Sequence, residues 1–354
     1  MSATILVSAG CLESFCNAVL KKAGLGERNA FTLTESLLFG DLRGLAAHGV
    51  ARLPEYLARV NAGVMKLDPP MPVERETPGS ALLDANNGLG QVAGAKAMAM
   101  AIEKAKSNGV ALVAVKNSNH FGAAAYFARM ACEADMIGLV TTNAAPSIAP
   151  YGAKVALVGT NPLCAAIPAA NRRPILLDMA TSVVARGKIW LAGLAGKKIP
   201  LGWALDPEGR PTEDPIAGQA GSLEAIGGAK GAGLSLVIDI LCGVMTGTGL
   251  SGDVRLIADL TAPSHTAHLL MAINVARFID VNVFKNNIDK VIERVKSLPS
   301  VSGSEIFLPG EIELNVEEKR RAEGIPLAAN VVEGLNKLAE QYAVPKLRTA
   351  AAGA

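Results

Sequence analysis

The sequence predicts a mixed α/β fold whose sheet is mixed or antiparallel rather than purely parallel. Helical and extended patterns alternate between residues 91 and 142, as is typical of α/β proteins. Two short apolar segments, 163–167 and 175–179, then follow one another without a helix between them, which favours an antiparallel pair. Two glycine patterns that resemble the dinucleotide fingerprint fail in their context, so the expected fold is not the Rossmann fold.

The first three expected elements are helices. One face of residues 11–23 collects apolar side chains at Leu12, Phe15, Cys16, Val19 and Leu20. Gly24 stands where a C-terminal glycine cap belongs. A second helix is expected at 34–46, and a third begins at Pro54, a favourable first helical position, and runs to about residue 61.

Helices and short strands then share the remaining chain. Strands are expected at residues 81–84, 110–115, 137–142, 163–167, 175–179 and 269–273. Helices are expected at residues 91–107, 123–133, 182–194, 231–245, 284–297 and 329–341. Residues 196–221 are rich in Gly, Pro and Asp and are expected to form a loop.

Composition excludes several classes of protein. The 354 residues suit two interleaved domains, and a net charge of +2 with interspersed signs leaves no basic stripe for nucleic acid. The five cysteines stand singly in apolar surroundings without zinc-like spacing, so we expect small buried hydrophobes and no metal site.

No segment has the character of a membrane or secretory signal. The longest stretch without a charged residue, 136–153, contains Thr, Asn and Pro that would leave polar groups unsatisfied in lipid. The first ten residues carry no Lys or Arg before their apolar run. We therefore expect a cytoplasmic protein without a membrane partner.

Both fingerprint-like patterns lack the surroundings that would bind a pyrophosphate. GTGLSG at 247–252 follows a helical pattern and precedes no helix start signal. GLGQVA at 88–93 opens a helix after an apolar run, but the next strand ends in Lys116 and Asn117 instead of the required acidic residue. Any nicotinamide site must be built in another way.

Two histidines stand in glycine-bordered segments suited to a site. His48 lies before Gly49, and His120 lies two residues before Gly122. Arg52 follows His48 by four residues, and an imidazole with a guanidinium can exchange a proton and hold a carboxylate. The alternatives are a structural hydrogen bond for either histidine and a capping cluster with a surface arginine.

Three further segments suit a phosphate or carboxylate. GTNP at 159–162 and LDMATS at 177–182 follow apolar runs, and Thr181 or Ser182 is expected to cap the next helix. Lys230 lies among glycines at 227–233, but without the GKS or GKT ending this is no P-loop, and a plain glycine-rich loop is the alternative.

Six motifs together resemble the type-2 malate/L-lactate dehydrogenase family: HGVARLPEY (48–56), NSNHFG (117–122), GTNP, LDMATS, GWALDPEGRPTEDP (202–215) and GGAKGAGLSLVID (227–239). The likeness runs from about residue 11 to 345 and extends to ureidoglycolate and sulfolactate dehydrogenases, diketogulonate reductases and cyclic imino-acid reductases. It implies hydride transfer between NAD or NADP and a small 2-hydroxy or 2-oxo carboxylic acid. Cyclic imino-acid reduction and a non-catalytic cofactor-binding homologue are the alternatives.

The resemblance also implies an architecture. A mostly antiparallel seven-stranded sheet would form the cofactor domain, residues 116–299. A second, interleaved helical domain would contain both termini, residues 1–115 with 300–354, and carry the substrate and dimer contacts. Members of the family are usually homodimers.

The resemblance assigns site residues by position. His48 ranks first as the acid/base and His120 second, while Arg52 and Tyr56 would contact the substrate. The implied cofactor-binding residues are Thr160, Asp178, Met179, Ala180, Thr181, Lys230, Pro309, Gly310 and Glu311. Ala47 replaces the Ser or Thr that many members have, and Lys188 agrees with the hydroxyacid-oxidising branches.

Overall fold

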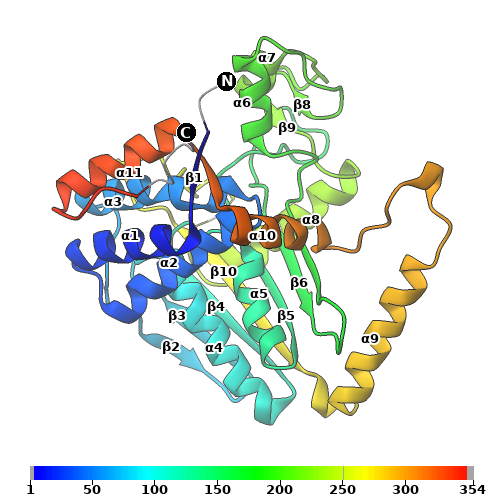
Figure 1. Cartoon of the computed structure of the whole chain (residues 1–354). Helices are drawn as coiled ribbons and strands as arrows, with labels where there is room; N and C mark the ends of the chain where they lie inside the picture. The colour runs from blue at the N-terminus through cyan, green and yellow to red at the C-terminus, as the bar shows by residue number, and fades with distance from the viewer. Residues whose placement is uncertain (1–3, 250, 349–354) are drawn as a thin grey trace.

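A seven-stranded sheet forms the centre of the protein in a computed structural model that describes residues 4–249 and 251–348 (Figure 1). In spatial order its strands are β2 (Val73–Glu76), β3 (Ser80–Asp84), β4 (Val110–Ser118), β10 (Thr266–Asn274), β5 (Met136–Thr142), β6 (Leu163–Ile167) and β7 (Ile175–Met179). The β3–β4 pair is parallel, and the other five neighbouring pairs are antiparallel. The predicted mixed α/β class is confirmed.

Strand direction explains where a site can form. Since β4, β5 and β7 run in the same direction, their carboxyl ends lie at the same edge of the sheet as the first residues of β6 and β10. Polar residues that end these strands, such as Ser118 and Thr142, are therefore brought together although they are far apart in the chain.

Helices cover both faces of the sheet because its strands alternate buried side chains on each side. On one face α4 (Gly90–Asn108) and α5 (Ala124–Glu133) pack against β4, β10 and β5. On the other face α8 (Ala229–Asp239) and a π-helical turn, η3 (Ile240–Val244), bury Ile238 and Cys242 against Ala114 and Leu269. The two cores thus use alternate residues of the same strands.

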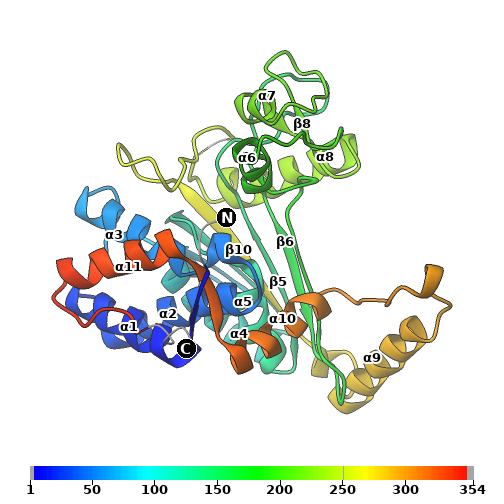
Figure 2. The same cartoon turned by 45° about the horizontal axis from the view of Figure 1, so that its top comes forward.

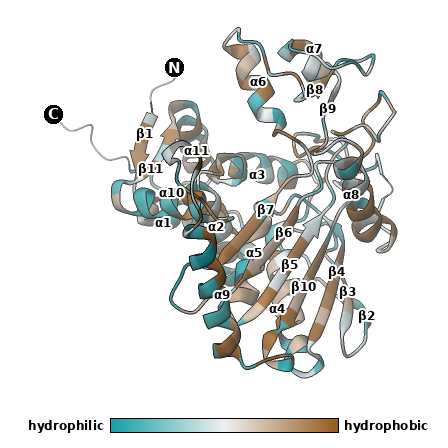
Figure 3. Cartoon of the chain, turned by 90° about the vertical axis from the view of Figure 1, so that its right-hand side faces the viewer, coloured by the Kyte–Doolittle hydropathy of each residue, from teal (hydrophilic) through white to brown (hydrophobic). Residues whose placement is uncertain are grey.

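Both ends of the described chain belong to one helical layer beside the sheet (Figure 3). This layer contains α1 (Ala9–Lys22), α2 (Glu27–Leu42), α3 (Leu53–Asn61), α10 (Glu311–Glu323) and α11 (Ala329–Gln341). The strand β1 (Thr4–Val7) pairs antiparallel with β11 (Ile325–Ala328) and joins the two ends. The division into two domains stays a prediction, and its boundary at 115/116 falls inside β4.

A small lobe lies at the end of the sheet where these polar strand ends meet (Figure 2). It contains α6 (Arg186–Leu194), β8 (Ala204–Leu205), α7 (Pro215–Ala220) and β9 (Ser222–Leu223), with a small core of its own around Ile189 and Leu223. At the opposite end of the strands, α9 (Val281–Lys296) extends from the body of the protein. Its Asp289 accepts backbone hydrogen bonds from the β6–β7 hairpin.

The structure corrects two expected helix starts. The second helix begins at Glu27 instead of residue 34 and ends at Leu42, because Gly44, with φ of +82°, turns the chain into the 3-10 turns η1 (Ala46–His48) and η2 (Val50–Arg52). The helix expected from 182 begins at Arg186 with Ala185 at its N-cap, so capping by Thr181 or Ser182 was wrong. Val183 instead donates its N–H to the carbonyl of Glu224.

The described residues include neither a membrane-spanning helix nor a metal-binding cluster. None of their helices combines the length and apolar character needed to cross a bilayer. Within the same ranges, no group of three or more His, Cys, Asp or Glu side chains is placed to hold a metal ion. Four of the cysteines are buried and all five are unpaired, and Cys11 is partly exposed.

Candidate active site

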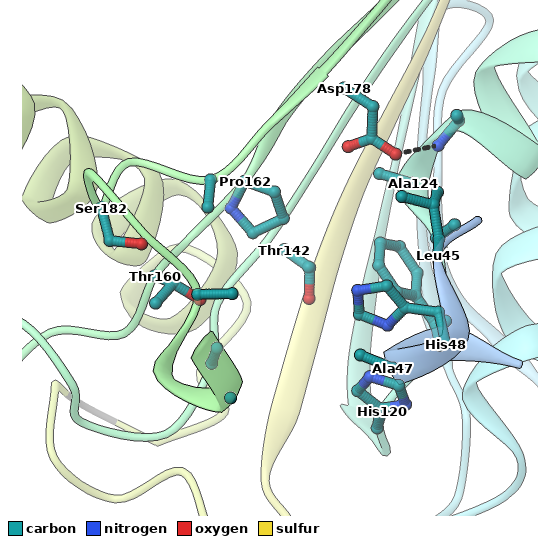
Figure 4. A pocket seen from close by; sticks show the side chains of 18 of the residues that line it. Leu45, Ala47, His48, His120, Ala124, Thr142, Thr160, Pro162, Asp178 and Ser182 are labelled. Atoms are coloured by element: carbon teal, nitrogen blue, oxygen red, sulfur yellow. Dashed lines mark hydrogen bonds between the residues drawn. The ribbon is translucent and has the colours of Figure 1, made fainter. Parts of the chain in front are cut away.

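A cleft of about 810 Å³ opens at the sheet edge where the polar strand ends meet (Figure 4). One wall comes from the turns after α2 and from the segment that follows β4. The opposite wall comes from residues near Thr160 and Ser182 and from the start of α6. Residues 254–257, 307–310, 312 and 313 also line the cleft.

The turn that carries His48 is fixed by Asp41 and two glycines. Asp41 is buried in α2 and accepts the N–H of Val50 at 2.7 Å, while burial raises its pKa to about 7. A Cβ at Gly49 would lie 2.0 Å from Oδ1 of Asp41, and one at Gly40 would lie 2.8 Å from the carbonyl oxygen of His48. The HG sequence is therefore required by close packing of this turn on α2.

His120 is held by the start of α4. A Cβ at Gly90 would lie 2.2 Å from the carbonyl oxygen of Asn119 and 2.6 Å from that of His120. The segment after β4 therefore covers the start of this β3–α4–β4 unit, which explains why GLGQVA cannot serve as a pyrophosphate loop. GTGLSG, the other rejected pattern, follows α8 and η3 and no strand.

The two histidines lie together on the cleft wall. Their rings stack with centroids 5.3 Å apart and planes inclined by 16°. Burial, aided by the charge of Arg52, lowers the pKa of His48 to about 4 and that of His120 well below its usual range. Both imidazoles are therefore neutral at pH 7, and Nδ1 of His48 is buried without a partner among the described residues.

Arg52 lines the same wall, close to both rings. Its Nε donates to the carbonyl oxygen of Ala47 at 2.8 Å, and its Nη1 lies 2.6 Å from Oε2 of Glu55. The turn and Glu55 thus hold the guanidinium, which keeps further N–H groups for a carboxylate.

Tyr56 lies behind this wall instead of in it. Its side chain is 1% exposed, and its hydroxyl is 2.7 Å from Nδ1 of His120. It is not among the residues that line the cleft, so its predicted contact with the substrate stays a prediction.

Part of the residue set predicted to bind the cofactor lines the same cleft as the histidines. The residues of this set that line it are Thr160, Asp178, Ala180, Pro309 and Gly310. Those outside the lining are Met179, Thr181, Lys230 and Glu311. The glycine loop nevertheless adjoins the LDMATS turn, since Ile226 donates its N–H to the carbonyl of Thr181 at 2.9 Å.

Two close contacts order the cofactor side. Oδ2 of Asp178 accepts the N–H of Ala125, in the first turn of α5, at 3.0 Å, and burial raises the pKa of Asp178 to about 6. Leu176 donates its N–H to Pro309, and a Cβ at Gly310 would lie 2.8 Å from the carbonyl oxygen of Leu176. The PGE segment is thereby docked against β7 beside Asp178.

The lining is suited to a dinucleotide. Ser182, which lines the cleft, has a buried hydroxyl oxygen with no partner among the described residues, and an unsatisfied group of this kind is stabilised by a polar ligand. The cleft volume of about 810 Å³ is within the range of cofactor sites.

Sequence reasoning missed three residues that support the site. His268 is fully buried between Thr142 and Ser118, 2.7 Å from each hydroxyl, and its ring stacks on Phe121. Arg59, 1% exposed, donates to backbone carbonyls of the 256–262 loop that borders the cleft. Arg43 pairs with Glu317 at 2.9 Å and lines the cofactor side.

Comparison with known proteins identifies the family of the chain. The family model described as Malate/L-lactate dehydrogenase matches residues 7–336. The chain belongs to this family. The resemblance inferred from the six motifs is therefore confirmed.

Relatives extend over almost the whole chain. It is 41% identical over 345 residues to a malate dehydrogenase of Pyrococcus horikoshii, covering 95% of each chain. It is 38% identical to a malate/(S)-sulfolactate dehydrogenase of Methanothermus fervidus, covering 91% of this chain and 94% of the relative. The solved sulfolactate dehydrogenase of Methanocaldococcus jannaschii superposes with a TM-score of 0.92 at 36% identity, covering 96% of this chain and 98% of that one.

Other family members differ in cofactor and substrate. A ureidoglycolate dehydrogenase (NAD(+)) of Escherichia coli is 33% identical over 93% of this chain and 94% of its own. A (2R)-3-sulfolactate dehydrogenase (NADP(+)) of Chromohalobacter salexigens is 37% identical over 78% of this chain and 83% of its own. The solved Δ1-piperideine-2-carboxylate reductase of Pseudomonas syringae superposes with a TM-score of 0.84 at 29% identity, covering 94% and 99%.

Proposed function

We propose that this protein transfers a hydride between NAD(H) or NADP(H) and C2 of a small 2-hydroxy or 2-oxo carboxylic acid. One observation carries the proposal: two neutral imidazoles and Arg52 lie in the same cleft as the cofactor segments around Asp178 and Pro309. Relatives named for malate and sulfolactate support a small acid with a second anionic group.

Each group on the histidine wall has a role in that reaction. Arg52 binds the substrate carboxylate through its planar N–H groups. A neutral imidazole, His48 first and His120 second, accepts the hydroxyl proton when the alcohol is oxidised. The nicotinamide, when bound, supplies or accepts the hydride, and Asp178, Ala180, Thr160 and Lys230 belong to the segments proposed to hold it.

Separate kinetics of His48→Ala and His120→Ala test the acid/base. NADH and NADPH oxidation is followed with a panel of 2-oxo acids. We expect turnover to fall about 100-fold or more in the variant that loses the acid/base. Full activity in both variants would contradict the proposal.

Cyclic imino-acid reduction is the second candidate, favoured by the structural likeness to the piperideine-2-carboxylate reductase. Lys188 argues against it, because this residue resembles the hydroxyacid-oxidising branches of the family. Including Δ1-piperideine-2-carboxylate in the panel separates the two activities. A non-catalytic homologue, which Ala47 would favour, would bind NAD(P)H and turn over nothing in the panel.

The proposed assembly is a homodimer in the cytoplasm. An apolar stripe of α8 and η3 supports the dimer, with side chains 36–52% exposed: Leu236, Val237, Ile240, Leu241, Val244 and Met245. Exposed apolar patches of this kind usually mark a protein interface. Five unpaired cysteines suit a reducing compartment.

A further inference from the structure

A buried chain of three polar side chains leads from the cleft wall into the protein. Nε2 of Gln91 lies 2.7 Å from the hydroxyl oxygen of Tyr56, which lies 2.7 Å from Nδ1 of His120. Gln91 is 0% exposed and Tyr56 is 1% exposed. Since solvent does not reach these two groups, their own donors and acceptors decide where each hydrogen lies.

The hydrogen bonds along these three side chains run in one direction, from donor to acceptor. An amide nitrogen can only donate, so the oxygen of Tyr56 accepts from Gln91. Tyr56 is a neutral phenol because burial raises its pKa, and its single hydrogen then points at Nδ1 of His120. That nitrogen must accept, which leaves the proton of the neutral ring on Nε2.

We propose that Gln91, acting through Tyr56, fixes the tautomer of His120 in which Nε2 carries the proton and is presented to the cleft. Gln91 and Tyr56 are thus positioning residues. The inference rests on the proposed function and refines it: with Nε2 protonated, His120 donates a hydrogen bond to the C2 oxygen, and the hydroxyl proton is left to His48, the acid/base ranked first.

This tautomer suits a 2-oxo acid. The Nε2–H is a hydrogen-bond donor for the C2 carbonyl oxygen, which gains negative charge as hydride arrives. The opposite tautomer would present a lone pair to that oxygen and repel it. A second imidazole, His48, stacks on the first and keeps its unpartnered Nδ1 for the same substrate.

Backbone packing fixes the positions of the hydrogen-bonded side chains. Gln91 is the second residue of α4, directly after Gly90, whose close approach to the carbonyl of His120 fixes the two segments against each other. A Cβ at Gly122, where φ is +82°, would lie 3.7 Å from Nε2 of Gln91. Gln91 is itself 0% exposed, so its amide has no solvent to turn towards in place of Tyr56.

Nitrogen-15 NMR of the full-length protein, labelled at histidine, tests the tautomer directly. We expect His120, assigned by the loss of its signals in His120→Gln, to show a protonated Nε2 and an unprotonated Nδ1. Gln91→Met keeps the shape but removes the donor, and Tyr56→Phe removes the hydroxyl. Both should give mixed tautomers at His120, whereas His268, held by Thr142 and Ser118, is the internal control and should not change.

Kinetics supply the second readout. Gln91→Met and Tyr56→Phe should each lower kcat about five- to tenfold, the effect of one neutral hydrogen bond, with little change in KM. Because Gln91 acts only through Tyr56, the double variant should be no slower than Tyr56→Phe alone.

Two results would overturn the inference. One is a wild-type His120 with its proton on Nδ1. The other is an unchanged tautomer in both variants while their melting temperatures show that they are folded. A tautomer that shifts while His120→Ala keeps full activity would uphold the hydrogen-bond chain and refute the proposed role of His120 in the reaction.

Discussion

At the scale of single residues, Arg52 is the side chain proposed to bind the substrate carboxylate, and it lines the cleft. Its guanidinium is braced by the carbonyl of Ala47 and by Glu55, so its plane is set before a ligand arrives. Such bracing reduces the entropy lost when a carboxylate binds. A lysine cannot replace this arrangement, because an ammonium group lacks the coplanar N–H groups with which a guanidinium binds a carboxylate.

We expect Arg52→Lys to raise the KM for the acid substrate at least tenfold with a smaller change in kcat. Loss of a charge-assisted hydrogen bond costs about 1.5–3 kcal/mol. Steady-state kinetics with a 2-oxo acid measure this, with Arg210→Lys, an exposed substitution on the small lobe, as the matched control. An unchanged KM would remove Arg52 from the substrate site.

Burial of neutral His48 makes stability depend on pH. Its pKa falls from 6.5 in the unfolded chain to about 4 in the folded one, so the unfolded state binds more protons between these values. This residue's contribution is therefore complete above pH 6.5 and is lost as pH falls towards 4. Burial raises the pKa of Asp41 to about 7, so this residue makes stability change with pH in the opposite direction. The contribution of His48 must therefore be isolated with a variant of that residue alone.

We expect His48→Gln to flatten the loss of unfolding free energy between pH 6.5 and 4. Denaturant unfolding at several pH values, compared with the wild type, gives the difference in slope. The substitution His265→Gln, at an exposed histidine, is the control. Parallel curves for wild type and His48→Gln would show that His48 titrates normally in the folded protein.

At the scale of elements, α4 and the segment after β4 depend on each other through Gly90. An alanine methyl there would overlap two backbone oxygens, at 2.2 and 2.6 Å, and neither can rotate away as a side chain does. The segment that carries His120 would have to move.

Gly90→Ala should therefore lower both the melting temperature and kcat. Overlap in a packed region costs about 1–3 kcal/mol. Gly10→Ala in α1 is the matched control, because nothing lies within 4 Å of its Cβ and the change should be neutral or slightly stabilising. Thermal unfolding and turnover of the two variants test this, and wild-type activity in Gly90→Ala would show that the loop adapts.

Some secondary-structure elements have a local signal in the sequence and others do not. Strands β6 and β7 form at the expected bounds because each is a short apolar run between turn residues. The edge strand β2 has four exposed residues and β1 pairs with a segment more than 300 positions away, so neither has a local signal. The histidines and Arg52 stand out in the sequence, whereas Gln91 reaches the site only through tertiary packing 35 positions from Tyr56.

At the scale of the whole molecule, the stripe on α8 and η3 is the surface proposed for the homodimer, and it lies outside the segments 1–115 and 300–354 predicted to carry the dimer contacts. Its apolar side chains recur every four residues from Leu236 and from Val237, so they lie on one exposed face of the helix. The inner side of the same helix already packs on the sheet through Ile238 and Cys242. A second copy of the chain could cover the outer strip about a two-fold axis.

We therefore expect Val237→Glu with Ile240→Glu to convert the dimer into a monomer at micromolar concentration, because each carboxylate would lose its hydration in the interface. Ile216→Glu, a charge placed at an exposed apolar residue of α7 in the small lobe, is the control and should remain dimeric. Sedimentation velocity gives the mass of each variant, and circular dichroism confirms that it is folded. If the double variant keeps the mass of the wild type, the stripe is not the dimer interface; if the wild type itself sediments as a monomer, the homodimer proposal is wrong.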